Sequence, residues 1–149
     1  MHLFGLSGFE WFFHRAANLD VDKNDFRRFD DFLSGKLQDL LLRAVENAAA
    51  NGHDAVQPQD LPITEGLQES IDAFTTLGET VSRDAVLEVV SRGTPLDLPL
   101  AEETQALLPG IVGGIGVALV RSFRIVDEKL KTPQATHWDR VTRIFDQLL

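Results

Sequence analysis

The stretch Asn18-Leu19-Asp20-Val21 has a counterpart 77 positions later in the chain, Pro95-Leu96-Asp97-Leu98. The same offset places Asp54-Ala55-Val56-Gln57 against Lys131-Thr132-Pro133-Gln134. A single short match carries little weight, but two matches at one offset indicate an internal repeat. All four segments have the composition of short extended links between helices. They therefore predict two similar halves, each with two such links.

Helical periodicity fills the stretches between these links. Apolar residues recur every three or four positions, as in Phe29, Leu33 and Leu37, which marks one buried helix face. Asp22 is a suitable N-cap for the first long helix, and Gly52 suits a left-handed residue after its end. Ser7 with Glu10 suits a capping box at the start of the chain's first helix. We expect helices over residues 8–17, 23–50, 58–77, 82–92, 101–129 and 133–149.

Each half thus consists of a short, a long and a short helix, and both long helices are too apolar to stand alone. Packing the two long helices across each other would bury both apolar faces. The sequence therefore predicts an all-α fold in which residues 1–77 and residues 78–149 form two repeats around one shared core. The length of 149 residues fits one such domain.

The composition excludes several classes of protein. Apolar residues make up 44% of the chain and charged residues 25%, which is typical of a globular protein and not of a disordered one. Cysteine is absent, so disulfide frameworks, thiolate zinc sites and cysteine nucleophiles are excluded. The net charge of −9 means that the overall field does not steer the chain to nucleic acid, so such binding needs a local basic patch.

The sequence also favours a location away from the membrane. The uncharged run at residues 104–120 contains Pro109 and four glycines and is slightly short for a membrane span. Residues 1–6 are apolar but lack the basic leader of a signal peptide, so we interpret them as an arm packed on the core. We expect a cytoplasmic protein, with the nucleoid as one location.

Four segments carry a resemblance to a known family: residues 16–25, residues 58–63, residues 66–69 and residues 107–109. With the short-long-short helix pattern, they make the chain resemble the bacterial single-chain, pseudodimeric histone-fold family, long described as a domain of unknown function. The resemblance covers nearly the whole chain and implies two fused archaeal-type histones that pack as an intramolecular pseudodimer.

The resemblance implies how the links pair. In a histone pair, the first loop of one copy lies beside the second loop of the other as a short parallel bridge. Residues 20–22 would then pair with residues 130–132, and residues 54–56 with residues 96–98. Gly110, Gly113 and Gly114 would lie near the crossing of the two long helices and let their backbones approach. Pro109 should kink the second long helix or mark its effective start.

Other readings of these motifs are weaker. The glycine-rich run at residues 110–116 could suggest a phosphate loop, but such loops follow a strand and this run lies inside a helical pattern. The four histidines match no zinc spacing, and His53 with Asp54 and Asp60 is either a weak metal site or a solvated loop cluster. No Ser-His-Asp order or paired carboxylate indicates catalysis. We therefore expect neither a cofactor nor an enzyme.

The aromatic cluster Phe9, Trp11, Phe12 and Phe13 has two interpretations. These rings could stack on nucleic-acid bases. At helical spacing next to a small core they are more simply explained as packing residues. Phe9, Phe12 and Phe13 share the buried side of the helix, so we expect Trp11 to be partly exposed.

The resemblance also guides the search for a DNA-binding surface. DNA-packaging archaeal histones carry a groove-inserting arginine on the first helix and basic residues on both loops. The matching first-helix positions are Trp11 and approximately Glu88, and the first-loop positions are Asp20 and Asp97. The second-loop Lys-Thr pair becomes Asp54-Ala55 in the first half and is kept as Lys131-Thr132 in the second.

One pair of loops is therefore expected to be acidic and the other to be the better candidate for DNA. The candidate DNA-binding residues are Lys23, Lys129, Lys131, Thr132 and Arg15, although Asp20 and Asp22 dilute this charge. The alternative is that these lysines are only solvated surface. Residues 1–75 carry 13 acidic and 6 basic groups, against 10 and 8 in the remainder, so the second half is the better nucleic-acid candidate.

Two functions follow as hypotheses. The first is a histone-like protein that binds double-stranded DNA without sequence specificity, with modest and salt-sensitive affinity. The second is a histone-fold module that binds proteins and not DNA, as the acidic surface and the missing arginines suggest. A monomer is the simplest expectation, although a protein partner or a homodimer through Trp11 or the apolar arm stays open.

Overall fold

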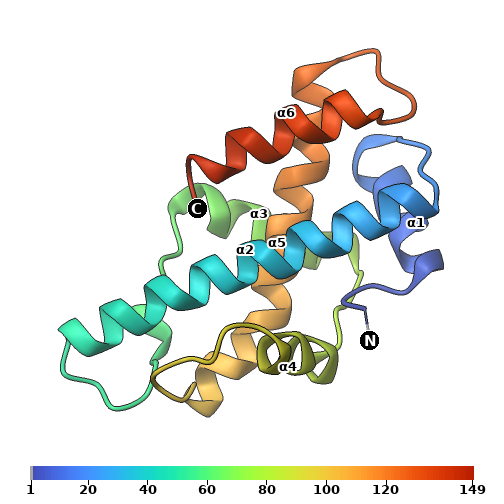
Figure 1. Ribbon diagram of the computed structural model, residues 1–149. Helices are drawn as coiled ribbons and strands as arrows, with labels where there is room; N and C mark the ends of the chain where they lie inside the picture. Colours follow the sequence, from blue (N-terminus) through green and yellow to red (C-terminus); the bar gives the residue numbers. More distant parts are fainter. Residues whose placement is uncertain (1) are drawn as a thin grey trace.

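The computed structural model in Figure 1 describes residues 2–149, and its secondary structure is helical. The described residues contain no strand, only one isolated parallel bridge, so the all-α prediction is confirmed. The elements are α1 (Leu6–Ala17), α2 (Lys23–Ala50), the 3-10 turn η1 (Pro58–Asp60), α3 (Glu65–Leu77), α4 (Arg83–Arg92), α5 (Glu102–Val126) and α6 (Ala135–Asp146).

The long helix α5 is the centre of the fold. Figure 1 shows α2 running across α5, and α5 contacts each of the other five helices. Its buried face runs from Thr104 to Phe123, with Leu108, Ile111 and Val120 almost completely covered. By length and composition α5 could cross a membrane, but 61% of its most apolar window is buried in the protein. It therefore serves as the core helix of this fold.

Helix ends follow the local sequence signals in most places. Asp22 accepts hydrogen bonds from the N–H groups of Asn24 and Asp25, and the Asp25 carboxylate accepts one from the Asp22 N–H, which completes a capping box. Gly52 is left-handed, with φ of 73°, as predicted. The capping box expected at Ser7 is wrong, because α1 begins at Leu6 and places Ser7 inside the helix.

The repeat is less regular than a single offset implies. The start of α5 lies 79 positions after the start of α2, but α6 starts only 70 positions after α3. Most of the difference lies in the second loops, because η1 lengthens the loop between α2 and α3, and the rest lies in the long helices, since α2 has 28 residues and α5 has 25. Both halves still run short, long, short. The division at residues 77 and 78 stays a prediction.

A cluster of phenylalanines fills the core beneath α1 and α2. Phe9, Phe12 and Phe13 are completely buried, and the ring centroids of Phe9 and Phe13 lie 4.8 Å apart. The packing interpretation of these three residues is therefore confirmed. Leu3 and Phe4 of the N-terminal arm are also buried, as predicted, while Met1 lies outside the described residues. Trp11 is 42% exposed, again as predicted.

The helix-crossing role predicted for Gly110, Gly113 and Gly114 needs correction. A Cβ on Gly113 would overlap the Phe74 ring, and one on Gly114 would lie 2.9 Å from the backbone nitrogen of Ile71. Both contacts are with α3, so these glycines bring α3, and not α2, close to α5. A Cβ on Gly110 would lie 3.6 Å from Ile71, which is ordinary contact distance. The reason is rotation: this glycine face of α5 points toward α3.

Pro109 lies within α5, seven positions after its first residue, so the alternative that Pro109 marks the start of this helix is wrong. Proline lacks the N–H that would bond the Gln105 carbonyl. The Gln105 side chain nevertheless supports the first turns, since its Nε2 donates to the Leu100 carbonyl and its Oε1 accepts from Arg83. α5 therefore begins well before the proline.

Candidate nucleic-acid interface

The first loop of each half lies beside the second loop of the other half. Residues 18–22 and residues 127–134 form one pair, which we call the Lys131 end, seen at the upper right of Figure 1. There the Asp20 N–H donates to the Lys131 carbonyl over 2.8 Å. The pairing predicted for residues 20–22 and 130–132 is thus confirmed. It places the backbones of the candidate lysine loop and of the first loop in contact.

Arg124 ties the Lys131 end together. Its guanidinium donates to the carbonyls of Ala17 over 2.5 Å, Leu130 over 2.7 Å and Glu128 over 2.8 Å, with a longer contact to Asn18. One planar cation thereby satisfies the last carbonyl of α1 and two carbonyls of the loop after α5. Sequence reasoning missed this residue. The available signal was an arginine in the last turn of a largely apolar helix.

The Lys131 end also joins α2 to α6. The Trp138 indole N–H donates to Asp25 over 2.7 Å, and both side chains are buried. Burial raises the pKa of Asp25, because it outweighs the hydrogen bonds from the Asp22 N–H and Trp138 that favour the carboxylate. This contact fixes the first turn of α2, which carries Lys23, against the first turns of α6.

The other loop pair consists of residues 51–64 and residues 93–101, and we call it the Val56 end. The Val56 N–H donates to the Pro99 carbonyl over 2.8 Å, and the Ala101 N–H donates to the Val56 carbonyl over 3.0 Å. This forms the parallel bridge between Val56 and Leu100. The pairing predicted with residues 96–98 is therefore wrong in register, because α5 begins later than the offset of 77 implies.

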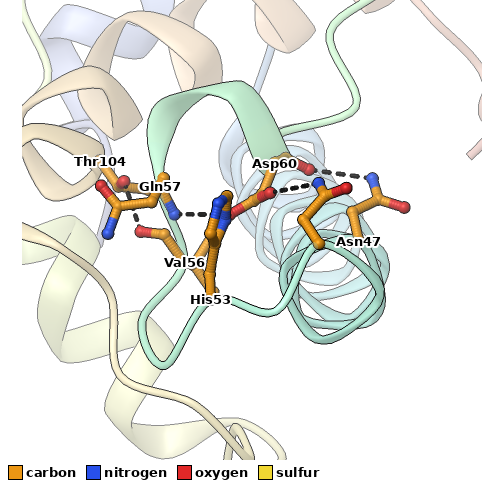
Figure 2. Close-up of polar contacts among 7 residues, drawn as sticks. Asn47, His53, Val56, Gln57, Asp60 and Thr104 are labelled. Atoms are coloured by element: carbon orange, nitrogen blue, oxygen red, sulfur yellow. Dashed lines mark hydrogen bonds and ion pairs between the residues drawn. The ribbon is translucent and has the colours of Figure 1, made fainter.

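A polar cluster around Asp60 shapes the loop at the Val56 end, as Figure 2 shows. Asp60 is completely buried; Asn51 donates to its Oδ1 over 2.9 Å, and the Gln57 N–H donates to its Oδ2 over 2.8 Å. His53 Nδ1 lies 2.8 Å from the same Oδ2, and Asn47 donates to the Asp60 carbonyl. Thr104 donates to the Val56 carbonyl beside this cluster.

These contacts explain the chemistry of Asp60. Burial alone would raise the pKa of Asp60, but hydrogen bonds from Asn51, the Gln57 N–H and His53 together hold it below its ordinary value. Both carboxylate oxygens are occupied by donors that fold the loop. Within residues 2–149 no group of three potential ligands is placed to hold a metal ion. The His53 and Asp60 pair is therefore best interpreted as a loop-folding contact.

The candidate DNA-binding residues Arg15, Lys23, Lys129, Lys131 and Thr132 are all exposed. The Arg15 guanidinium lies over the Trp11 ring, 5.8 Å from its centroid. Further basic residues were missed by sequence reasoning. Among residues 2–149, the exposed Lys and Arg side chains that make no hydrogen bond or ion pair are Arg15, Lys23, Arg27, Arg28, Arg121, Lys129, Lys131 and Arg140.

These eight cations share one location in the fold. They belong to the end of α1, the first turns of α2, the last turns of α5, the loop after it, and α6. All of these segments meet at the Lys131 end. In contrast, residues 44–82 and residues 93–120 contain no Lys or Arg and ten Asp or Glu, and they include the whole Val56 end. The unpaired cations thus lie on the segments that meet at one end of the molecule, where exposed carboxylates such as Asp20, Asp22 and Glu128 also lie.

Comparison with known proteins gives a family and a fold. The family model described as "Domain of unknown function (DUF1931)" matches residues 9–146. An uncharacterised protein of Aquifex aeolicus (strain VF5) is 22% identical over 111 residues, and the match covers 74% of this chain and 65% of that relative. The chain therefore spans about two thirds of the length of this relative.

Solved structures are similar over almost the full chain. A Thermus thermophilus protein has a TM-score of 0.94 and 43% identity, covering 99% of both chains. An Aquifex aeolicus protein has a TM-score of 0.82 and 19% identity, covering 97% of this chain and 95% of its own. The histone from Methanopyrus kandleri has a TM-score of 0.62 and 13% identity, covering 91% and 90%. The last similarity shows that the fold is histone-like.

Proposed function

Since the chain belongs to the DUF1931 family and has a histone-like fold, we propose that it is a histone-like protein that binds double-stranded DNA without sequence specificity. The observation that carries the proposal is the gathering of eight unpaired cations at the Lys131 end. Histones hold DNA through phosphate contacts and deformability, without reading bases, so such a patch is the feature to look for. The protein acts in this proposal by binding and not by catalysis.

The arrangement of the Lys131 end suits phosphate contacts. Lys23 lies in the first turn of α2, and Lys129 and Lys131 lie in the loop beside it, which Arg124 and the Asp20 N–H hold in place. Thr132 adds a hydroxyl that can donate to a phosphate oxygen. The same loops carry exposed acidic groups, Asp20, Asp22 and Glu128, so few phosphates are neutralised in total.

The balance of basic and acidic groups at the Lys131 end sets the expected affinity for DNA. With about three or four phosphates contacted, log K should fall with log salt concentration with a slope of roughly −3 to −4. Affinity is accordingly modest and is lost at high salt. The Val56 end repels phosphate, so one molecule holds DNA from a single end. A minor component of the nucleoid is the cellular role that fits this binding.

The test is fluorescence anisotropy of a labelled random duplex at several salt concentrations. The double variant Lys23→Glu with Lys131→Glu should abolish binding while the circular dichroism spectrum stays unchanged. The matched control is Arg43→Glu with Arg83→Glu, which changes net charge equally on exposed side chains away from the Lys131 end. Equal loss in both variants, or unchanged binding by the first, would show that the Lys131 end is not the binding surface.

A second candidate function is a protein-interaction module, and an apolar groove favours it. The groove has a volume of about 340 Å³ between α3, α5 and α6, and Leu67, Ile115, Phe145 and Leu148 are among its lining residues. Leu148 is 74% exposed, so apolar surface is available there for a partner. This candidate predicts a stable complex that does not depend on the lysines of the Lys131 end.

The two candidates can be separated with one further variant. Leu148→Asp should leave DNA binding unchanged if the Lys131 end carries it. If the groove binds a second copy, light scattering during size-exclusion chromatography should give a dimer mass for the parent chain and a monomer mass for this variant. A monomer mass for both, together with salt-sensitive DNA binding, would favour the first candidate.

A further inference from the structure

An open groove of about 460 Å³ lies between α1 and the loop that follows it. Its lining residues come from the exposed face of the helix and from the loop: Ser7, Glu10, Trp11, His14, Leu19, Asp20 and Val21. Trp11 is the exposed member of an aromatic cluster whose other members are buried. The phosphate contacts proposed above do not use this groove, although it opens beside the Lys131 end.

One cation lies over the aromatic ring of the groove, and the backbone of the lysine loop borders the groove. The Arg15 guanidinium lies 5.8 Å from the centroid of the Trp11 ring. The Asp20 N–H, at the other wall, is bonded to the Lys131 carbonyl over 2.8 Å. An aromatic face with cations beside it is the combination that proteins use to hold a single nucleic-acid strand, with bases stacked on the ring and phosphates on the basic groups.

The carboxylates of the groove exclude one occupant and favour another. The side chains of Glu10 and Asp20 make no hydrogen bond or ion pair within residues 2–149. Their negative charge keeps phosphate itself out of the groove. The same oxygens can accept hydrogen bonds from the exocyclic amino group of a base, as acidic residues do for cytosine N4.

We propose that this groove takes an unstacked nucleobase of a single DNA strand. The base stacks on the face of the Trp11 ring opposite Arg15, its exocyclic amino group donates to Glu10 or Asp20, and the neighbouring phosphates pair with Arg15 and Lys131. The inference rests on the DNA binding proposed above and adds a preferred form of DNA to it. Single-stranded segments are preferred over intact duplex, in which no base can reach the ring.

The carboxylates also give the groove a base preference. Thymine has no exocyclic amino group and presents a carbonyl oxygen at the equivalent position, which Glu10 and Asp20 repel. Cytosine presents the amino donor. A protein that binds single strands only by stacking and by contacts to the backbone does not require an amino group on the base. A preference for cytosine over thymine therefore distinguishes binding in this groove from unspecific electrostatic binding of the DNA backbone.

The experiment compares oligo-dC and oligo-dT of equal length by fluorescence anisotropy at low salt and slightly alkaline pH. We expect oligo-dC to bind about fivefold more tightly or better, and Trp11→Ala to weaken its binding by about fivefold or more. Leu107→Ala is the matched control, because Leu107 is 44% exposed and lies near the other end of the molecule. This variant should bind like the parent chain.

Tryptophan emission gives a second readout. The chain has only two tryptophans, and Trp138 is buried while Trp11 is exposed. Oligo-dC should quench the emission of the parent chain and leave that of Trp11→Ala unchanged. Glu10→Ala with Asp20→Ala supplies a double variant that keeps the ring: it should lose the preference for oligo-dC while its binding of oligo-dT rises.

The outcomes separate this inference from the proposed function. Equal binding of the two oligonucleotides, with Trp11→Ala unaffected, would overturn the groove while salt-sensitive duplex binding stands. Absence of binding to any DNA, duplex included, would overturn both. Oligo-dC binding that needs Trp11 in a protein that ignores duplex would support the groove and overturn the duplex proposal.

Discussion

The Lys131 end and the Val56 end hold equivalent loop pairs with opposite chemistry. At the Lys131 end a cation, Arg124, donates to the main-chain carbonyls of Ala17, at the end of α1, and of Leu130, in the loop after α5. At the Val56 end a buried carboxylate, Asp60, accepts hydrogen bonds from the donors of one loop. Loop pairing in this fold therefore does not need a basic surface. The side chains of the exposed lysines of the Lys131 end make no hydrogen bond or ion pair within residues 2–149, so the loop pairing does not rest on them.

The third residue of each long helix also differs in its hydrogen-bond partner between the two ends. Asp25 of α2 and Thr104 of α5 are both buried polar residues. Asp25 accepts from the Trp138 indole of α6, whereas Thr104 donates to the Val56 carbonyl. The third residue of the long helix thus bonds a side chain at the Lys131 end and a main-chain carbonyl at the Val56 end. Which partner is bonded depends on the segment that faces the helix, which is α6 for Asp25 and the loop at Val56 for Thr104.

The largest effect is expected from breaking the clamp of the Lys131 end. Arg124→Ala removes charge-assisted hydrogen bonds to three carbonyls and should lower the free energy of unfolding by about 3 kcal/mol. Urea unfolding followed by circular dichroism measures the change. The control is Arg121→Ala, one turn earlier and exposed, which should change stability by less than about 0.5 kcal/mol. Equal effects of the two variants would refute the clamp.

A smaller effect is expected from making the Val56 end resemble the Lys131 end. Asp54→Lys with Asp97→Lys places two exposed cations where the chain has two exposed carboxylates. At roughly 1 kcal/mol per phosphate contact, duplex affinity should rise by about 2 kcal/mol, with a steeper salt dependence. Anisotropy titrations against the parent chain measure both. Unchanged affinity and slope would mean that the Val56 end cannot approach DNA.

Thr104→Val tests the hydrogen bond that links α5 to the Val56 bridge. The substitution removes the hydroxyl that donates over 2.7 Å to the Val56 carbonyl. The carbonyl keeps its bond from the Ala101 N–H, so we expect a loss of only about 1 kcal/mol in urea unfolding. A loss as large as that of Arg124→Ala would contradict the assumption that the bridge survives.

The two buried carboxylates should respond to acid in opposite directions. The pKa of Asp60 is lowered, so its stabilisation is present above ~3.9 and is lost as pH falls through the lower folded value. The pKa of Asp25 is raised, so the native state takes up its proton first and stability is gained as pH falls toward ~3.9.

Urea unfolding as a function of pH can separate these two contributions. Asp60→Asn should flatten the loss of stability below pH ~3.9, because the proton uptake that destabilises the loop is gone. Asp25→Asn should remove the gain in the free energy of unfolding that the parent chain shows as the pH falls toward ~3.9. The same pH profile in both variants and the parent chain would contradict the opposite shifts.

Much of the fold could be predicted from the sequence because its signals are local. Asp22 caps α2 at the predicted position, and Gly52 is left-handed just after the end of α2, as predicted. The pairing of residues 20–22 with residues 130–132 came from the resemblance and is confirmed by the Asp20 bond to Lys131. The candidate lysines also came from the resemblance, and their role in DNA binding stays a prediction.

Periodicity and composition thus determined the helices and the apolar character of α5, and the family resemblance added the pairing of the loops and the difference in charge between the two ends. Only the tertiary structure decided that Gly113 and Gly114 face α3, that Val56 pairs with Leu100, and that Arg124 reaches the carbonyl of Ala17. The physical reason is that these contacts join residues far apart in the chain. They depend on how each helix is rotated about its axis and on the exact length of each loop, which a hydrophobic pattern does not specify.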